Sequence, residues 1–183
     1  MSTAASQHPS RPVSGLPPLV VMGVSGCGKT SVGEAIAAHF GIPYIEGDAM
    51  HPPANIAKMS AGTPLNDEDR WPWLDALASR LKAEAETRNG AVATCSALKL
   101  AYRDRIQAGS GPETRFIFLD CARETLERKL AGRKGHFMPP SLLDSQLATL
   151  EPPYAEARAI IIDGDLPFET VIRSIVEALE QGA

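Results

Sequence analysis

The stretch LVVMGVSGCGKT, residues 19–30, decides the fold of this chain. Four apolar residues run into the pattern G-x-x-x-x-G-K-[ST], which starts at Gly23 and ends in Lys29 and Thr30. The glycines let backbone N–H groups turn inward around phosphate oxygens. Lys29 places a positive charge on the outer phosphates, and the Thr30 hydroxyl is a ligand for the accompanying Mg²⁺. The motif therefore predicts a phosphate-binding loop between a buried strand and a helix.

The sequence on either side of the motif supplies the context that it needs. Val32, Ile36 and Phe40 recur at helical spacing after the loop, and Gly41 then ends the helix. A helix that begins at about Lys29 turns its positive end toward the phosphates. The alternative is a glycine-rich turn with no ligand, but the strand before the loop and the helix after it favour the phosphate site.

The length and composition are those of one globular domain. The chain has 183 residues, 44% of them hydrophobic, and a formal net charge of −4, so no basic field points to nucleic acid. No apolar run is long enough to span a bilayer. Cys27, Cys95 and Cys121 form no CxxC pair, which favours a reducing compartment and hence the cytoplasm. Residues 1–17 are rich in Ser and Pro, so we expect a disordered tail before a single domain over residues 18–183.

Short apolar runs alternate with helical patterns along the rest of the chain. The runs at residues 19–22, 42–45, 91–95, 116–119 and 160–162 are the expected strands. A clear amphipathic helix is expected over residues 73–85, after a capping segment at residues 66–69, and another closes the chain at residues 168–179. This alternation predicts an α/β fold with a parallel sheet, whose ligands bind at the carboxyl ends of the strands.

Two carboxylates follow the second expected strand. Asp48 can serve as the general base for a phosphoryl acceptor, or it can cap a turn or hold Mg²⁺ through water, and the residues alone leave these alternatives open. Glu46 lies two residues earlier. If the strand continued, both carboxylates would share one face, and Glu46 would lie near the metal.

Each basic residue that could bind substrate or phosphate could instead have a purely structural role. Arg70 can clamp a carboxylate with its guanidinium fork, although residue type alone favours a surface ion pair with Asp67 or Asp69. Arg128 and Arg133 lie where a lid over the phosphates needs positive charge, but a solvated basic helix end would have the same composition. His51 and His136 occur in Gly- and Pro-rich loops, a setting that favours ligand contact over a core position.

Several blocks, in this order, resemble the gluconate kinases (gluconokinases), small phosphate-loop kinases related to shikimate and nucleoside-monophosphate kinases. The phosphate loop is common to many families, and the other blocks are more specific. They are EGDAMHP at residues 46–52, NIAKM at 55–59, GTPLNDEDR at 62–70, PWL at 72–74, CSALK at 95–99, YRD at 102–104 and RKGHF at 133–137. Together with the loop they extend from about residue 19 to the end of the chain.

This resemblance implies a reaction and an architecture. The reaction is ATP-dependent phosphorylation of D-gluconate at its 6-hydroxyl, giving 6-phospho-D-gluconate and ADP, with Mg²⁺ as the cofactor. The implied fold is the three-layer P-loop NTPase fold of the nucleoside-monophosphate-kinase type, with a five-stranded parallel sheet in the order 2-3-1-4-5 flanked by helices. A mobile lid is expected around residues 131–140. Members are commonly homodimers, and no nucleic acid or membrane partner is implied.

The resemblance also assigns roles to residues. The implied catalytic residues are Lys29, Asp48 and Arg133, and Thr30 is the metal ligand. ATP would be held by Gly23, Val24, Ser25, Gly26, Cys27, Gly28, Lys29 and Thr30, with Arg128 against the adenine. Gluconate would be held by residues of the family blocks: Asp48, His51, Lys58, Arg70, Lys99 and His136. Glu46 stands where some relatives carry Asp, so a direct metal role for it stays open.

Two rival functions are consistent with parts of this pattern. The same fold phosphorylates shikimate or a nucleoside monophosphate in other families, and the combined blocks argue against both acceptors. A nucleotide-binding module without catalysis is the second rival. The presence of Lys29, Thr30 and Asp48 together argues against that module.

Overall fold

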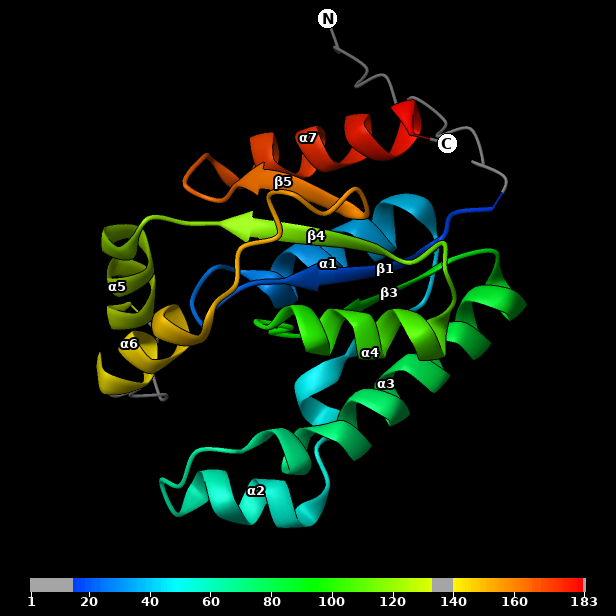
Figure 1. Ribbon diagram of the computed structural model, residues 1–183. Coiled ribbons are helices and arrows are strands. Elements are labelled where there is room, and N and C mark those ends of the chain that lie inside the picture. The colour runs from blue at the N-terminus through cyan, green and yellow to red at the C-terminus, as the bar shows by residue number, and fades with distance from the viewer. Residues whose placement is uncertain (1–14, 133–139, 183) are drawn as a thin grey trace, which may run out of the picture.

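A computed structural model describes residues 15–132 and 140–182 (Figure 1). Along the chain the elements are β1 (Pro18–Met22), α1 (Lys29–Phe40), β2 (Tyr44–Glu46), the 3₁₀ helix η1 (Gly47–Met50), α2 (Pro53–Ser60), α3 (Asp67–Arg88), β3 (Ala91–Thr94), α4 (Leu100–Ser110), β4 (Arg115–Asp120), α5 (Arg123–Ala131), α6 (Pro140–Thr149), β5 (Ala159–Asp163) and α7 (Phe168–Gln181). The strands pair in parallel in the order β2-β3-β1-β4-β5, which confirms the order that the family resemblance implied.

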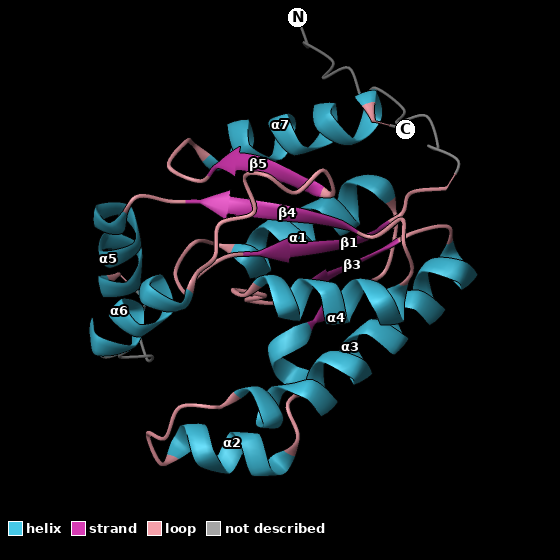
Figure 2. Ribbon diagram, viewed as in Figure 1, coloured by secondary structure: helices cyan, strands magenta, loops and turns pink. Residues whose placement is uncertain are grey.

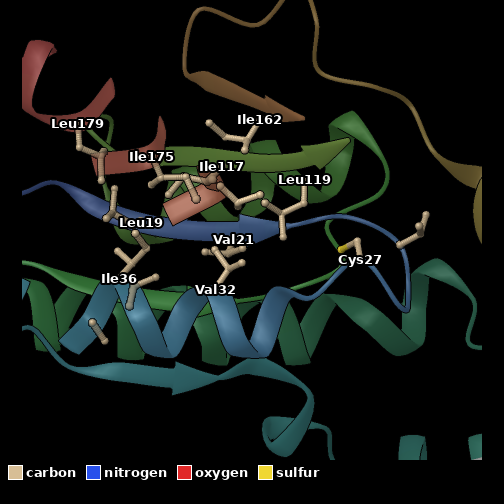
Figure 3. Packing of buried hydrophobic residues seen from close by; sticks show 14 of the residues in the cluster. Leu19, Val21, Cys27, Val32, Ile36, Ile117, Leu119, Ile162, Ile175 and Leu179 are labelled. Carbon is tan, nitrogen blue, oxygen red and sulfur yellow. The ribbon is translucent and has the colours of Figure 1, made fainter. Parts of the chain in front are cut away.

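The sheet is the middle layer of three. Successive residues of β1 point to opposite faces, as they must in a strand. Leu19 and Val21 pack with the cluster that includes Val32 and Ile36 of α1 and Ile175 of α7 (Figure 3). The alternate residues of β1 pack on the other face, against α3 and α4. Because both faces are covered, β1 is an unbroken apolar run rather than an alternating one.

The connections to opposite faces create a crevice. The loop after β1 leads to α1 on one face of the sheet, whereas the loop after β3 leads to α4 on the other face. β1 and β3 are neighbours, so their two loops diverge at the carboxyl edge, where open α/β sheets bind ligands. Figure 2 shows the strand arrows pointing toward this edge, with α5 and α6 beyond it.

Two boundaries differ from the sequence expectation. α3 begins at Asp67 rather than Trp73, because a capping box starts it: Asn66 accepts from the Asp69 N–H at 2.8 Å and its own N–H donates to the Asp69 carboxylate at 3.0 Å. Leu16, expected in the disordered tail, is 6% exposed and belongs to the core. That part of the tail prediction is wrong, since β1 already begins at Pro18. Residues 1–14 lie outside the described part of the chain.

Candidate active site

The phosphate loop joins β1 to α1 as the motif predicts. Gly28 caps α1 in the left-handed region with φ 102°, and Gly23 has φ 141°. A Cβ at Gly23 would lie 2.9 Å from the Sγ of Cys27, so the loop also needs glycine there for space. Cys27 itself is buried against the core. The loop is therefore a tightly packed turn that presents its N–H groups at the end of α1.

Lys29 and Thr30 leave the first turn of α1 in different directions. The Lys29 ammonium donates to the Val24 carbonyl at 3.1 Å, so its charge lies against the beginning of the loop. The Thr30 hydroxyl donates to a carboxylate oxygen of Glu46 at 2.9 Å. The hydroxyl and carboxylate oxygens meet at the edge of the sheet beside the loop, and hard divalent cations prefer such oxygen ligands. These residues thus fit Mg²⁺.

Glu46 is held by three hydroxyl groups. Besides Thr30, it accepts from Tyr44 at 2.6 Å and from Thr94 at 2.6 Å. Burial alone would raise the pKa of Glu46, but the hydrogen bonds from Thr94, Tyr44 and Thr30 outweigh it and lower that pKa. Burial and the neighbouring carboxylate raise the pKa of Tyr44 to about 12. Glu46 is therefore a fixed carboxylate. The sequence had no signal for Tyr44 and Thr94 as its partners.

Asp48 does not share a strand face with Glu46, and that expectation is wrong. The chain leaves β2 at Glu46 and turns at once into η1, where Asp48 is exposed. The turn is fixed by Gly47, whose carbonyl accepts from the Trp73 indole at 2.8 Å. A Cβ at Gly47 would lie 1.9 Å from the Thr94 carbonyl oxygen, so no larger residue fits. Asp48 thus projects from a rigid turn at the ligand edge of the sheet.

His51 follows this turn and lies flat on a tryptophan. Its ring stacks on Trp73 with 3.9 Å between centroids and 22° between planes, and its Nδ1 is 3.3 Å from the Asn55 amide nitrogen. Burial lowers the pKa of His51, Asp48 partly offsets this, and Arg70 lowers it further. His51 is therefore within electrostatic range of both Asp48 and Arg70, and its predicted contact with substrate stays a prediction.

Arg70 is not paired with the acids beside it, so the surface ion pair that residue type alone favoured is wrong. Its Nη2 donates to the Leu65 carbonyl at 3.4 Å, and its guanidinium lies over the Tyr102 ring at 5.5 Å. Its buried Nε has no hydrogen-bond partner among the residues that the structure describes. A buried guanidinium N–H without a partner is costly. An anionic group that reached the Arg70 guanidinium could supply the missing partner.

The acids beside Arg70 are occupied by other cations. Lys58 of α2 pairs with Asp69 at 2.6 Å, and Lys99 pairs with Asp67 at 2.8 Å. Tyr102 also donates to Asp67 at 2.5 Å. The hydrogen bond from Lys99 lowers the pKa of Asp67, and the bond from Lys58 lowers that of Asp69. Lys58 and Lys99 therefore brace the start of α3 on both sides of Arg70, and their predicted contacts with substrate stay predictions.

The loop after β3 is held beside the phosphate loop. The Gly23 N–H donates to the Ser96 carbonyl at 3.3 Å. Arg103, 1% exposed, donates to the carbonyls of Ala97 and Leu98 and pairs with Glu156. These bonds fix the CSALK block, and through it the position of Lys99.

The remaining predicted residues belong to α5 and the segment after it. Arg128 lies on α5, where its Nη2 is 3.3 Å from the Thr125 hydroxyl. α5 touches the phosphate loop, since a Cβ at Gly26 would lie 2.9 Å from the Leu130 Cγ. Arg133, His136 and most of the expected lid lie outside the described residues, so their roles stay predictions.

Comparison with known proteins places this geometry in a family. The family described as shikimate kinase matches residues 25–180. The gluconokinase of Gluconobacter oxydans (strain 621H) is 46% identical over 158 residues, which cover 86% of this chain and 88% of that protein. The chain belongs to the gluconokinase family.

Among solved structures, a gluconokinase is similar to this chain in both fold and sequence, whereas a shikimate kinase is similar in fold only. A gluconokinase from Sinorhizobium meliloti 1021 has a TM-score of 0.84 and 47% identity, covering 94% of this chain and 95% of that chain. The shikimate kinase from Aquifex aeolicus has a TM-score of 0.54 and 16% identity, covering 90% and 96%, and shares the fold alone. The expected three-layer P-loop kinase fold and the gluconokinase resemblance are both confirmed.

Proposed function

We propose that this protein transfers the γ-phosphoryl group of ATP to the 6-hydroxyl of D-gluconate, giving 6-phospho-D-gluconate and ADP. The observation that carries the proposal is Arg70, whose buried Nε has no hydrogen-bond partner among the described residues and whose charge, like that of Asp48, acts on His51. An anionic acceptor supplies the partner that this guanidinium lacks, because a carboxylate matches the fork of an arginine. Gluconate is such an acceptor, and gluconokinases are this chain's relatives.

The phosphate side of the reaction belongs to the loop and its helix. The N–H groups of residues 23–30 that have no partner among the described residues bind the phosphate oxygens, and Lys29 swings from the Val24 carbonyl to the outer phosphates. Thr30 would hold Mg²⁺ directly, and Glu46, bonded to Thr30, would support the ion through its waters. Bound Mg²⁺ neutralises charge on the phosphates. Phosphoryl transfer depends mainly on such positioning and charge neutralisation.

The acceptor side belongs to η1 and the start of α3. Arg70 binds the carboxylate end of gluconate and so aligns the chain of hydroxyls. Asp48 then accepts the proton of the 6-hydroxyl as that oxygen attacks the γ-phosphorus. His51, Lys58 and Lys99 line the acceptor site, and the ion pairs of the two lysines keep α3 in place around Arg70.

The rest of the proposal concerns assembly and closure. Arg128 packs against adenine, and Arg133 and His136 approach the phosphates and gluconate from a lid around residues 131–140. Lid closure excludes water, which would otherwise compete with the acceptor hydroxyl. We further propose a cytoplasmic homodimer. No helix in residues 15–132 and 140–182 is long and apolar enough to cross a membrane.

The position of the new ester tests the proposed reaction. The enzyme is incubated with MgATP and ¹³C-labelled D-gluconate, and the product is examined by ³¹P and ¹³C NMR. A phosphate ester coupled to carbon 6 is the expected result. An ester at another hydroxyl, or ADP formation without any ester, would contradict the proposal.

A further inference from the structure

A side chain from α6 is bonded to the phosphate loop, far from it in sequence. The Ser25 N–H donates to the amide oxygen of Gln146 at 2.7 Å, and the amide nitrogen of Gln146 donates to the Ser25 hydroxyl at 3.0 Å. The amide oxygen and the amide nitrogen of Gln146 thus both bond to Ser25. The sequence motif gives no sign of this contact, since 121 residues separate the partners.

Ser25 lies in the half of the loop away from α1, which begins at Lys29. The Lys29 ammonium donates to the carbonyl of Val24, the residue directly before Ser25. The lysine of this motif acts on the β- and γ-phosphates. Gln146 therefore holds the loop next to the residue that Lys29 contacts, and the proposed reaction has the outer phosphates bound on this side of the loop.

α6 is anchored well enough to act as a support. Leu143, on the turn before Gln146, is 2% exposed and belongs to the core beside Leu126. Two residues after the end of α6, the Glu151 N–H donates to the Leu98 carbonyl at 2.8 Å, and the Glu151 carboxylate accepts from the Leu100 N–H at 2.6 Å. α6 and the short segment after it thus touch both the phosphate loop and the loop that carries Lys99.

We propose that Gln146 is a positioning residue for phosphoryl transfer, which holds Ser25 so that the outer-phosphate end of the loop keeps the shape that binds the γ-phosphoryl group of ATP. The Ser25 N–H donates to Gln146 and so does not need a phosphate oxygen as its partner. The other N–H groups of the loop stay directed toward the nucleotide. The inference rests on the proposed kinase function. Gln146 acts through Ser25 and does not itself touch the reacting atoms.

A merely structural glutamine would stabilise the fold without distinguishing nucleotides. A carboxylate at the same place is the discriminating change. Gln146→Glu keeps an acceptor for the Ser25 N–H and introduces negative charge beside the outer phosphates. Because charge repulsion falls with distance, binding of ATP should weaken more than binding of ADP, which lacks the γ-phosphate. Gln146→Leu removes both hydrogen bonds with little change in size.

The test is calorimetric titration of MgATP and MgADP into wild type, Gln146→Glu, Gln146→Leu and Ser145→Ala, with steady-state kinetics and thermal unfolding of each. Ser145 is the exposed neighbour of Gln146 on α6, and its variant should match wild type throughout. We expect Gln146→Leu to lose about tenfold in kcat/KM for ATP, the size of one or two lost hydrogen bonds. We expect Gln146→Glu to weaken ATP binding at least about tenfold more than ADP binding.

Two results would overturn the inference. One is equal weakening of ATP and ADP by Gln146→Glu. The other is wild-type kcat/KM for ATP in Gln146→Leu, whatever its melting temperature. The nucleotide titrations need no acceptor, so they remain decisive for Gln146 even if gluconate proved to be the wrong substrate.

Discussion

Thr30 and Glu46 are joined by a 2.9 Å hydrogen bond that links the first turn of α1 to the end of β2. The bond brings a hydroxyl of the phosphate motif against a carboxylate that two further hydroxyls hold in place. If Thr30 binds Mg²⁺ as proposed, a carboxylate so fixed beside it could orient the waters around the ion.

Glu46→Gln should therefore weaken the use of Mg²⁺. The amide keeps the size of the side chain but removes its charge, and changes of this kind typically cost about 10- to 100-fold in metal affinity. The measurement is kcat against free Mg²⁺ at saturating ATP, where the half-saturating concentration should rise. Glu34→Gln, an exposed change on α1, is the matched control. An unchanged Mg²⁺ dependence in Glu46→Gln would remove Glu46 from the metal site.

Asp48→Asn tests the general base. Loss of a positioned base costs about 10²- to 10⁴-fold in turnover, whereas ATP affinity should stay near normal because Asp48 lies on the acceptor side of the site. Single-turnover rates and ATP titration on the same preparation separate the two effects. Asp75→Asn removes an acid that pairs with Arg105 on the surface, and it should leave turnover unchanged. Normal turnover in Asp48→Asn would exclude the base role.

Arg70→Lys tests whether the guanidinium fork, and not charge alone, binds the acceptor. Lysine keeps the charge but cannot form two parallel bonds to a carboxylate. We expect KM for gluconate to rise about 10- to 100-fold, the loss for a charged hydrogen bond, with KM for ATP little changed. Arg80→Lys, exposed on the same helix, serves as the control. An equal rise in both KM values would mean that Arg70 supports the fold of the site and does not bind gluconate.

The half-buried His51 should make the protein less stable in acid. Burial lowers its folded-state pKa below the ordinary 6.5, so below that pH the unfolded chain binds a proton that the folded chain does not. The free energy of unfolding should therefore fall as the pH drops through 6.5 and stop falling, for this residue, below the folded-state pKa. His51→Phe keeps an aromatic ring on Trp73 without a titrating group.

Urea unfolding of wild type and His51→Phe between pH 8 and 5 (~0.5 steps) checks this prediction. The difference between the two curves isolates His51 from the carboxylates that also titrate in acid. The wild-type curve should fall more steeply than that of the variant. Parallel curves would show that His51 takes up its proton equally well in the folded protein.

Local pattern was enough to predict an α/β fold with a parallel sheet, because strands, helices and the phosphate loop each depend on neighbouring residues, whereas the strand order came from the family resemblance. The capping segment at residues 66–69 was recognised for the same reason, and only its consequence, a helix beginning at Asp67, was missed. The wrong placement of Asp48 has a tertiary cause. A close approach between Gly47 and Thr94 ends β2 early, and spacing along the chain cannot reveal it.

Contacts between distant segments account for the other misses. Leu16 looks like part of a polar tail in the sequence, yet it fills the core beside β1. Arg70 was expected to pair with Asp67 or Asp69, but Lys58 and Lys99 arrive from other segments and take both acids. The Arg70 guanidinium therefore pairs with neither acid, and its Nε has no hydrogen-bond partner among the described residues, an outcome that depends on the assembled fold.

The most direct test of the proposed reaction is the initial rate of ADP release from MgATP with D-gluconate, shikimate or AMP supplied separately. The account predicts rapid release with gluconate and release near the acceptor-free background with shikimate and AMP. Turnover of shikimate or AMP without turnover of gluconate would contradict it.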